Sequence, residues 1–499
     1  MLVWFLPVFL VALMIGLPVF FALLVSPGML LWLNGQERDM ALLYRNVYNG
    51  MDSFPLMALP FFMLAGELMN RGGITTRLVE FSQALMGHLR GGLAHVNILS
   101  SILFAGLSGS AVADTSALGS TLIPAMEKNG YTRKFAAAVT AASSVIGPII
   151  PPSGIMIIYA YVMGESVAAL FLAGIVPGIM VGVGLMLVVR LMADKYDLPK
   201  AERIVSKNQE LTQLEHWVSF VLLRLNFAGV LLGVYAGIGA AVQYSSGADI
   251  AVNNWILMAV FLVIAHFVLM AIRPRVSADF RVVCKKAVAP LQAPIIILGG
   301  ILVGVFTPTE ASAVAVAYAL LISFFVLRSM KLSDLPSIFT KSALGSSTVL
   351  LLVGAAVAFK TVVSLSHAPE QLAGFILNLS DDPLILLFLI NLLLFIVGMF
   401  LDAGPAIIIL GPILGPIFVE LGVHPVHFAI IMSVNLTVGL ATPPMGLVLF
   451  VASSVSGEKV ETISKAILPF LAVEVLVIFL ITYVPAISMT VPRLTGFVQ

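Results

Sequence analysis

The sequence predicts an all-α polytopic membrane protein with an internally duplicated element. Of its 499 residues, 60% are hydrophobic and only 10% are charged, whereas soluble proteins carry about 25% charged residues. The chain has room for about a dozen spans of ~20 residues each. Ten Gly and Pro residues lie in 106–154, and eight of them meet the identical residue 292 positions later. Such a fixed offset indicates an internal duplication.

The duplicated element predicts interrupted helices. It pairs Gly106 with Gly398 and Gly147 with Gly439, in strongly apolar surroundings. Gly and Pro deep in apolar sequence indicate broken helices, which a membrane tolerates only where protein or water satisfies the freed backbone groups. One such element in each half is typical of a secondary transporter whose binding site lies at the repeat interface.

The composition argues against several other classes. The net charge of +1 gives no reason to expect a nucleic-acid partner, and Cys284 is the only cysteine, which excludes an internal disulfide. No glycine-rich loop carries the lysine of a P-loop, so ATP is not expected to be the direct energy source. Neither a catalytic cluster nor a metal-ligand spacing nor a channel filter motif appears in the sequence. We therefore expect no enzyme and no organic cofactor.

The first half is predicted to alternate spans with shorter elements. Leu2–Leu33 is expected to be a retained span, bent at Pro18 and Pro27, and Asn34–Asp52 an amphipathic helix along the interface. The further elements are the short apolar Pro55–Met69, a helix over Thr75–Leu89, a re-entrant hairpin over Asn97–Met126, a span over Phe135–Val162 broken at Gly147–Pro152, and a span over Val167–Met192.

The rest of the chain begins with two additional spans. Basic residues flank both sides of this excursion, which places both flanks on the cytoplasmic face by the positive-inside rule. The expected elements are spans over Trp217–Val242 and Ile256–Ile272, an apolar stretch Leu291–Leu327 interrupted at Thr307–Glu310, an interfacial arm over Ser329–Lys341, a span over Ala343–Ser364, a short apolar piece over Ala373–Leu379, a second hairpin over Leu384–Phe418, a span over His427–Val455 broken at Gly439–Pro444, and a last span over Leu468–Ile487.

The hairpin tips carry the sharpest polar clusters. The first runs from Ser108 to Thr115 and contains Asp114, and the matching tip of the second copy contains Asp402. A charged Asp in the membrane costs several kcal/mol unless it is paired or hydrated. Backbone carbonyls with Ser, Thr and Asp oxygens suit a hard cation such as sodium. A small-residue helix-packing face is the alternative interpretation.

The two breaks share the pattern G-x-x-x-P-P-x-G. The paired prolines, Pro151–Pro152 and Pro443–Pro444, remove two amide donors, so helical hydrogen bonding fails and carbonyls one turn earlier are free to face a ligand. Asn435 precedes the second break and would add a side-chain oxygen. A third interruption, Thr307–Glu310, suits either a helix cap or a site contact. Lys360 would either snorkel to an interface or pair with an acid.

Several long stretches resemble a known family. They are PLMALPFFMLAGELMNRGGIT from Pro55, GHLRGGLAHVNILSSILFAGLSGSAVADTSALG from Gly87, AAAVTAASSVIGPIIPPSG from Ala136, GGILVGVFTPTEASAVAVAYA from Gly299 and GLATPPMG from Gly439. The chain resembles the large membrane subunit, the dicarboxylate-type M subunit, of tripartite ATP-independent periplasmic (TRAP) transporters. The resemblance covers residues 1–192 and 287–499. Two extra spans within Leu211–Arg275 depart from the family pattern.

The resemblance implies a sodium-driven importer of small organic acids in the bacterial inner membrane. A periplasmic binding protein would deliver the acid, and a small four-span membrane subunit would complete the membrane part. The fold would consist of inverted repeats in a scaffold and an elevator-like transport domain. The divisions would be 1–96 (N-terminal scaffold and arm), 97–166 (first transport half), 167–290 (scaffold and linker with the 211–275 pair), 291–372 (second scaffold and arm), 373–456 (second transport half) and 457–499 (last span).

The tips, the interruptions and the resemblance together give the candidate site residues. The sodium ligands would come from Ser108, Gly109, Ser110, Asp114, Gly398, Asp402, Asn435, Thr442 and Pro443. The substrate contacts would come from Thr115, Pro151, Pro152, Ser153, Pro444, Thr307, Thr309 and Glu310. The alternative function is a stand-alone sodium-coupled carboxylate or ion transporter that needs no binding protein.

Overall fold

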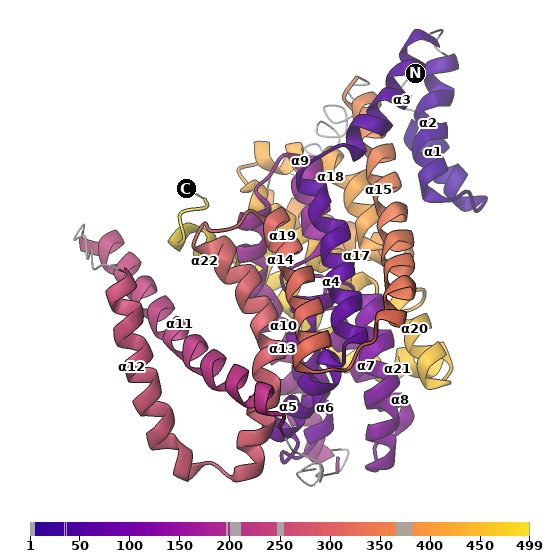
Figure 1. Ribbon diagram of the computed structural model, residues 1–499. Helices are drawn as coiled ribbons and strands as arrows, with labels where there is room; N and C mark the ends of the chain where they lie inside the picture. Colours follow the sequence, from indigo (N-terminus) through magenta and orange to yellow (C-terminus); the bar gives the residue numbers. More distant parts are fainter. Residues whose placement is uncertain are drawn as a thin grey trace.

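The computed structural model describes residues 5–33, 35, 37–195, 198–199, 211–246, 254–365, 374 and 382–498. In these residues the regular structure is entirely helical, and nine helices are long and apolar enough to cross a membrane (Figure 1). The predicted all-α, multi-pass membrane class is therefore confirmed. Of the apolar piece expected over Ala373–Leu379, only Gly374 lies among the described residues.

The N-terminal span predicted over Leu2–Leu33 consists of two helices instead of one bent span. α1 (Phe5–Met14) and α2 (Val19–Leu33) pack against each other. The chain turns between them at Gly16, whose φ of 85° favours glycine. Pro18 directly precedes α2, where its fixed φ and missing N–H are tolerated, whereas Pro27 lies inside α2.

The interfacial helix predicted over Asn34–Asp52 is present as α3 (Glu37–Met51). It packs along the upper part of the long helix α15 (Leu335–Leu365) in Figure 1. The Asn46 side chain donates a 3.0 Å hydrogen bond to the Thr361 hydroxyl across this contact.

The second arm, predicted over Ser329–Lys341, is not a separate element. Only a short 3-10 turn, Leu332–Asp334, precedes α15, and α15 then runs for 31 residues without interruption. Pro336 falls in the first turn of the helix, where a missing amide N–H costs nothing. Because neither Gly nor Pro separates the polar segment from the apolar one, the helix continues through both.

The two copies of the duplicated element have matching helices. The first copy is α6 (Gly92–Ser108), α7 (Ala111–Lys128), α8 (Arg133–Ser144), α9 (Gly154–Met163) and α10 (Val167–Lys195). The second copy is α17 (Pro383–Phe400), α18 (Ala403–Glu420), α19 (Pro425–Gly439), α20 (Leu447–Ser456) and α21 (Val460–Tyr483). Two residues join α6 to α7, and two join α17 to α18, so each copy begins with a helical hairpin.

The copies exchange packing partners. The second hairpin arm of the first copy, α7, packs against α20 of the second copy, while α18 of the second copy packs against α9 of the first. In the same way, α21 of the second copy packs against α8 of the first, and α10 of the first copy packs against α19 of the second. This reciprocal arrangement brings the two hairpins and the two breaks to one centre.

The remaining helices surround this centre. α4 (Ala58–Arg71) packs against α14 (Pro308–Leu321) and α15, and α5 (Ile74–Met86) packs against α6 and α13 (Ala278–Leu302). Of the basic residues after the two additional spans, Arg273 and Arg275 form a 3-10 turn, and Arg281, Lys285 and Lys286 lie in the first turns of α13. The last span, predicted over Leu468–Ile487, begins at Val460, and a short helix, α22 (Ala486–Leu494), follows it.

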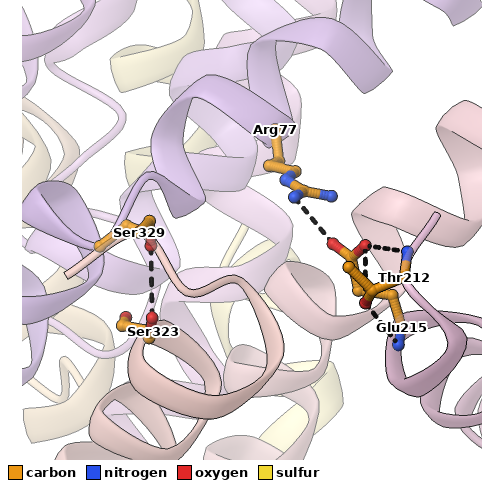
Figure 2. Close-up of polar contacts among 6 residues, drawn as sticks. Arg77, Thr212, Glu215, Ser323 and Ser329 are labelled. Atoms are coloured by element: carbon orange, nitrogen blue, oxygen red, sulfur yellow. Dashed lines mark hydrogen bonds and ion pairs between the residues drawn. The ribbon is translucent and has the colours of Figure 1, made fainter. Parts of the chain in front are cut away.

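The two additional spans are confirmed as α11 (Gln213–Ser246) and α12 (Asn254–Ile272), which stand to one side of the bundle in Figure 1. The start of α11 is attached to α5 by an ion pair of 2.8 Å between Arg77 and Glu215. The other Glu215 oxygen accepts from the Thr212 backbone N–H at 2.9 Å, as Figure 2 shows. Figure 2 also shows Ser329, whose hydroxyl donates to the Ser323 carbonyl at 3.4 Å.

Candidate functional site: a cavity between the hairpin tips

A cavity of about 300 Å³ lies where the two hairpin tips meet. One wall is made by the tips and by the first break. The opposite wall is made by α4 and α15 and is almost entirely apolar. The residues of the first wall are Ser108–Val112, Asp402–Pro405, Pro148, Pro152, Gly154, Ile155, Ile158 and Leu440; those of the second are Leu59, Phe62, Met63, Thr348, Val349 and Leu352.

The first tip is held by a left-handed glycine and a serine cap. α6 ends at Gly109, whose φ is 60°, and Ser110 is extended and caps α7 by accepting from the Ala113 amide. A Cβ atom at Gly109 would lie 2.8 Å from the carbonyl oxygen of Pro152. Only glycine fits, both for its φ and for this contact between the tip and the break.

Asp114 lies in the first turn of α7 and is completely buried. The Ser108 hydroxyl donates to its Oδ1, whereas its Oδ2 has no hydrogen-bond partner among the described residues. A Cβ atom at Gly147 would collide with Oδ2, so this oxygen is directed at the backbone of the first break. A buried oxygen without a partner is expensive unless something satisfies it, and a cation held between the tip and the break would do so.

The first break spans the residues between α8 and α9. Ser153 caps α9, and its hydroxyl donates to the Pro148 carbonyl at 2.5 Å, which closes the loop on itself. The Pro151–Pro152 bond is cis, as is the Pro443–Pro444 bond of the second break. Both interruptions predicted from the paired prolines are thus present.

The second tip places a carboxylate at the cavity. Asp402 caps α18 by accepting from the Ala403 amide at 2.8 Å, and its side chain remains accessible. Of the described residues that line the cavity, it is the only ionisable one. Gly398, one turn before the tip, packs directly on Gly439. A Cβ atom added at Gly398 would lie 3.1 Å from the Cα atom of Gly439.

The second break lies behind its tip. Asn435 is buried and donates to Asn391 at 2.6 Å and to the Ile431 carbonyl at 2.8 Å, while its Oδ1 has no partner among the described residues. Thr442 donates back to the Val438 carbonyl at 2.8 Å. Leu440 reaches the cavity, whereas Thr442, Pro443 and Pro444 are absent from its lining.

Three helix N-termini converge on the cavity. The first residues of α7, α9 and α18, namely Ala111, Gly154 and Ala403, all line it. The first amide groups of a helix have no partner within the helix, and the macrodipole adds a partial positive charge there. The Ala403 amide already donates to Asp402, but the other first-turn amides leave several donors for an anion, although no Lys, Arg or His among the described residues lines the cavity.

Buried polar contacts fix each hairpin to its broken helix. Asn97 of α6 donates to Thr140 of α8 at 2.6 Å and accepts from Ser143 at 3.3 Å. In the second copy Asn391 of α17 accepts from Asn435 of α19 and, at 3.2 Å, from Thr482 of α21.

Several predicted substrate residues lie elsewhere or use their hydroxyls internally. Thr115 is buried and donates to the Ala111 carbonyl at 2.8 Å. Thr307 and Glu310 form a complete capping box at the start of α14, and the Thr309 hydroxyl donates to the Phe54 carbonyl at 3.2 Å. None of these four lines the cavity. Of the two interpretations of Thr307–Glu310, the geometry favours the helix cap.

The wall from α4 and α15 could not be predicted from the sequence. Among the described residues of that wall, Thr348 carries the one hydroxyl group. The sequence feature that could have pointed to it is a Ser-Ser-Thr run inside an otherwise apolar span. Phe62 and Met63 belong to a stretch that matched the family but carried no polar cue.

The model of the family described as "Tripartite ATP-independent periplasmic transporter, DctM component" matches residues 6–262 and 250–487. The chain belongs to this family. As a TRAP transporter large permease it is a transporter and not an enzyme, and the stand-alone alternative is set aside. Permeases of this kind work with a small permease and a periplasmic binding protein.

Named relatives match most of the length of the permease. The C4-dicarboxylate TRAP transporter large permease protein DctM of Pseudomonas aeruginosa is 33% identical over 89% of this chain and 88% of its own. The sialic acid TRAP transporter large permease protein SiaM of Vibrio cholerae is 34% identical over 96% and 95%. Among solved structures, the Alcanivorax borkumensis YdaH transporter has a TM-score of 0.54 at 14% identity, over 89% and 88% of the two chains. That likeness concerns the fold.

Proposed function

We propose that the permease carries small organic acids, such as dicarboxylates or sialic acid, together with sodium across the bacterial inner membrane. The convergence of the α7, α9 and α18 N-termini on one cavity carries this proposal. Paired discontinuous helices bind anionic substrates through such N-termini in other secondary transporters. Their amide donors suit a carboxylate without the desolvation of a lysine or arginine.

The sodium part rests on the negative charges at the same place. Asp402 lines the cavity and Asp114 lies buried directly behind the first tip. An acid entering beside Asp402 would be repelled, at close range by several kcal/mol in a partly dry site. A cation bound at the tip would offset this repulsion, so acid and sodium would enter together. The orphaned Oδ2 of Asp114, together with freed carbonyls of the break, fits a hard cation.

The two walls of the cavity support an elevator mechanism. The polar wall comes from the hairpins and breaks. The Asn97 and Asn391 contacts hold each hairpin to its own broken helix, and the packing of α7 on α20 and of α18 on α9 joins the two copies. The opposite wall, from α4 and α15, is apolar apart from Thr348. An apolar face permits sliding because few directional contacts must be broken. We propose that the hairpins, which would be re-entrant, move with α8, α9, α19 and α20 against α4 and α15.

The proposed partners are a small four-span membrane subunit and a periplasmic protein that delivers the acid. In the test, the permease is reconstituted into liposomes with both cognate partners, and uptake of radiolabelled C4-dicarboxylates and sialic acid is measured under an inward sodium gradient. Uptake that requires the gradient and the binding protein is expected. Equal uptake with potassium replacing sodium would refute the coupling, and equal uptake without the binding protein would refute the delivery step.

A further inference from the structure

A second and larger cavity, of about 550 Å³, lies far along the chain from the hairpin tips. It is enclosed by the start of α11, the end of α12 and the first turns of α13. These are the two additional spans and the helix that follows them. Nothing in the transport mechanism proposed above uses this cavity.

Four permanently or ordinarily cationic side chains line it: Arg224, Arg273, Arg281 and Lys285. The guanidinium of Arg224 lies 3.4 Å above the centre of the Phe220 ring and donates to the Phe220 carbonyl at 2.7 Å. Arg281 donates to the Arg273 carbonyl at 3.3 Å. Stacking and hydrogen bonding hold these groups in place, which prepares a planar guanidinium for an oxyanion.

Two histidines of the lining add further donors. Arg224 Nε donates to His266 Nδ1 at 3.0 Å, and the Lys285 ammonium lies 3.2 Å from His216 Nδ1. Because arginine and lysine only donate, both Nδ1 atoms must accept, and each ring then carries its proton on Nε2. Each neutral histidine thus has a remaining N–H donor.

Among the described residues, no acidic side chain lines this cavity and no partner forms an ion pair with its four cations. Glu215 directly precedes His216 but is paired with Arg77, and Asp279 is exposed on the first turn of α13; neither is part of the lining. Like charges gathered without a counter-charge repel one another. The contacts above use only some of the N–H groups of these cations. Spare donors and cations without a described counter-anion together suit an acceptor-rich anion, and a phosphate group fits this description best.

The cavity also opens towards the lipid-facing surface. Met270 and Ile272 line it and are 53% and 41% exposed, respectively. Leu223 and Leu269 add apolar wall beside the cationic part. Such a combination of an apolar slope and a basic pocket between spans suits a lipid whose headgroup is anionic. The flanking basic residues place this end at the cytoplasmic leaflet by the positive-inside rule, and anionic lipids are found there.

We infer that the cavity between α11, α12 and α13 binds the phosphate of an anionic phospholipid headgroup from the cytoplasmic leaflet. The two additional spans would then be a lipid-binding attachment of the permease. This role is independent of the sodium and substrate chemistry at the hairpin tips.

Native mass spectrometry of the purified full chain tests this inference. The protein is delipidated in detergent and titrated with phosphatidylglycerol, cardiolipin or phosphatidylcholine. We expect one tightly retained phosphatidylglycerol or cardiolipin and no retained phosphatidylcholine. In the double variant Arg281→Gln/Lys285→Gln the affinity for the anionic lipid should fall at least about tenfold.

The matched control is Arg275→Gln/Lys286→Gln, which removes two cations from the same segment but none from the lining. It should retain the lipid, and thermal unfolding of both double variants should match the parent. An equal loss of lipid affinity in both double variants would mean that net charge alone causes the effect, and the proposed site would be overturned. A conservative Arg281→Lys variant keeps the test decisive if the first double variant unfolds.

Inorganic phosphate distinguishes the two sources of the anion. If millimolar phosphate binds and no lipid is retained, the ligand is a soluble phosphate and the lipid assignment is overturned. Cys284, the only cysteine, lines the cavity and gives a second measurement. Anionic vesicles of phosphatidylglycerol should slow its alkylation by N-ethylmaleimide relative to phosphatidylcholine vesicles. Equal rates would contradict occupancy of the cavity.

Discussion

The ammonium group of Lys360 donates a 2.5 Å hydrogen bond to the carbonyl oxygen of Val162. Lys360 belongs to α15 and Val162 lies in the last turn of α9, so this bond joins the two helices outside the lining of the tip cavity. A cation at a helix C-terminus is stabilised by the macrodipole and by the unpaired carbonyls. The sequence predicted snorkelling or an acidic partner for Lys360, and the structure uses a helix end instead.

Replacing Lys360 with methionine should therefore destabilise the permease by about 1.5–3 kcal/mol, the usual contribution of a hydrogen bond to a charged group. The control is Lys341→Met on the same helix, because Lys341 forms an ion pair with Glu67 while its side chain is 69% exposed. Exposed pairs contribute about 0–1 kcal/mol. Thermal unfolding in detergent measures the stability of both variants. An equal loss of stability in the two would show that the hydrogen bond to Val162 stabilises the protein no more than an exposed ion pair does.

Asp114→Asn should weaken sodium activation of uptake at least about tenfold, because it removes the buried negative charge beside the first break. The apparent sodium affinity is obtained by titrating sodium at a fixed acid concentration in proteoliposomes. Glu127→Gln on the same helix, α7, is the matched variant, since Glu127 forms an exposed ion pair with Arg133. An unchanged sodium titration of the Asp114 variant would remove this residue from the proposed ion site.

Gly109→Ala should abolish most uptake and lower stability by at least about 1–2 kcal/mol, the cost of a left-handed conformation for alanine. The added Cβ would also press on the Pro152 carbonyl, which sits 2.8 Å away. At Gly299, in the helical part of α13, an added Cβ meets nothing within 4 Å. Gly299→Ala should leave uptake unchanged, and an active Gly109→Ala variant would contradict the close contact between tip and break.

Thr307→Ala should reduce stability by about 0.5–2 kcal/mol through the loss of a helix cap, while both the sodium affinity and the choice of acid stay unchanged. The reason is that Thr307 and Glu310 bond each other at the start of α14 and do not line the tip cavity. Uptake competition between malate and sialic acid checks this. A changed preference at unaltered stability would restore Thr307 to the substrate site.

The breaks and tips were predictable because their signals are local. Consecutive prolines cannot continue a helix, and the Ser-Gly-Ser run at 108–110 contains both the left-handed glycine and the cap. Their meeting at one cavity followed from the duplication and the family resemblance, whereas the identity of the opposite wall did not. Thr348 lies on that wall through packing between distant segments, which no local pattern encodes.

Helix continuity was the least predictable feature. The polar residues before α15 resembled an interfacial arm, yet the helix runs through them, and the apolar first 33 residues turned out to hold two helices.

Glu474 is a polar residue that the sequence did not single out. It is fully buried in α21, and neither carboxylate oxygen has a partner among the described residues. An acid inside a 24-residue apolar helix was visible in the sequence, but its burial depended on the neighbouring helices.

The reciprocal packing of α7 on α20 and of α18 on α9 has a consequence for biosynthesis. When the ribosome has finished α9, the neighbour that will cover α7 is still nearly 300 codons away. The first copy must wait in the bilayer with an uncovered flank, and it reaches its final form only when the second copy arrives. Dividing the gene between the copies would thus yield two fragments that each lack the packing partners supplied by the other copy. Activity would then require both fragments to assemble in one membrane.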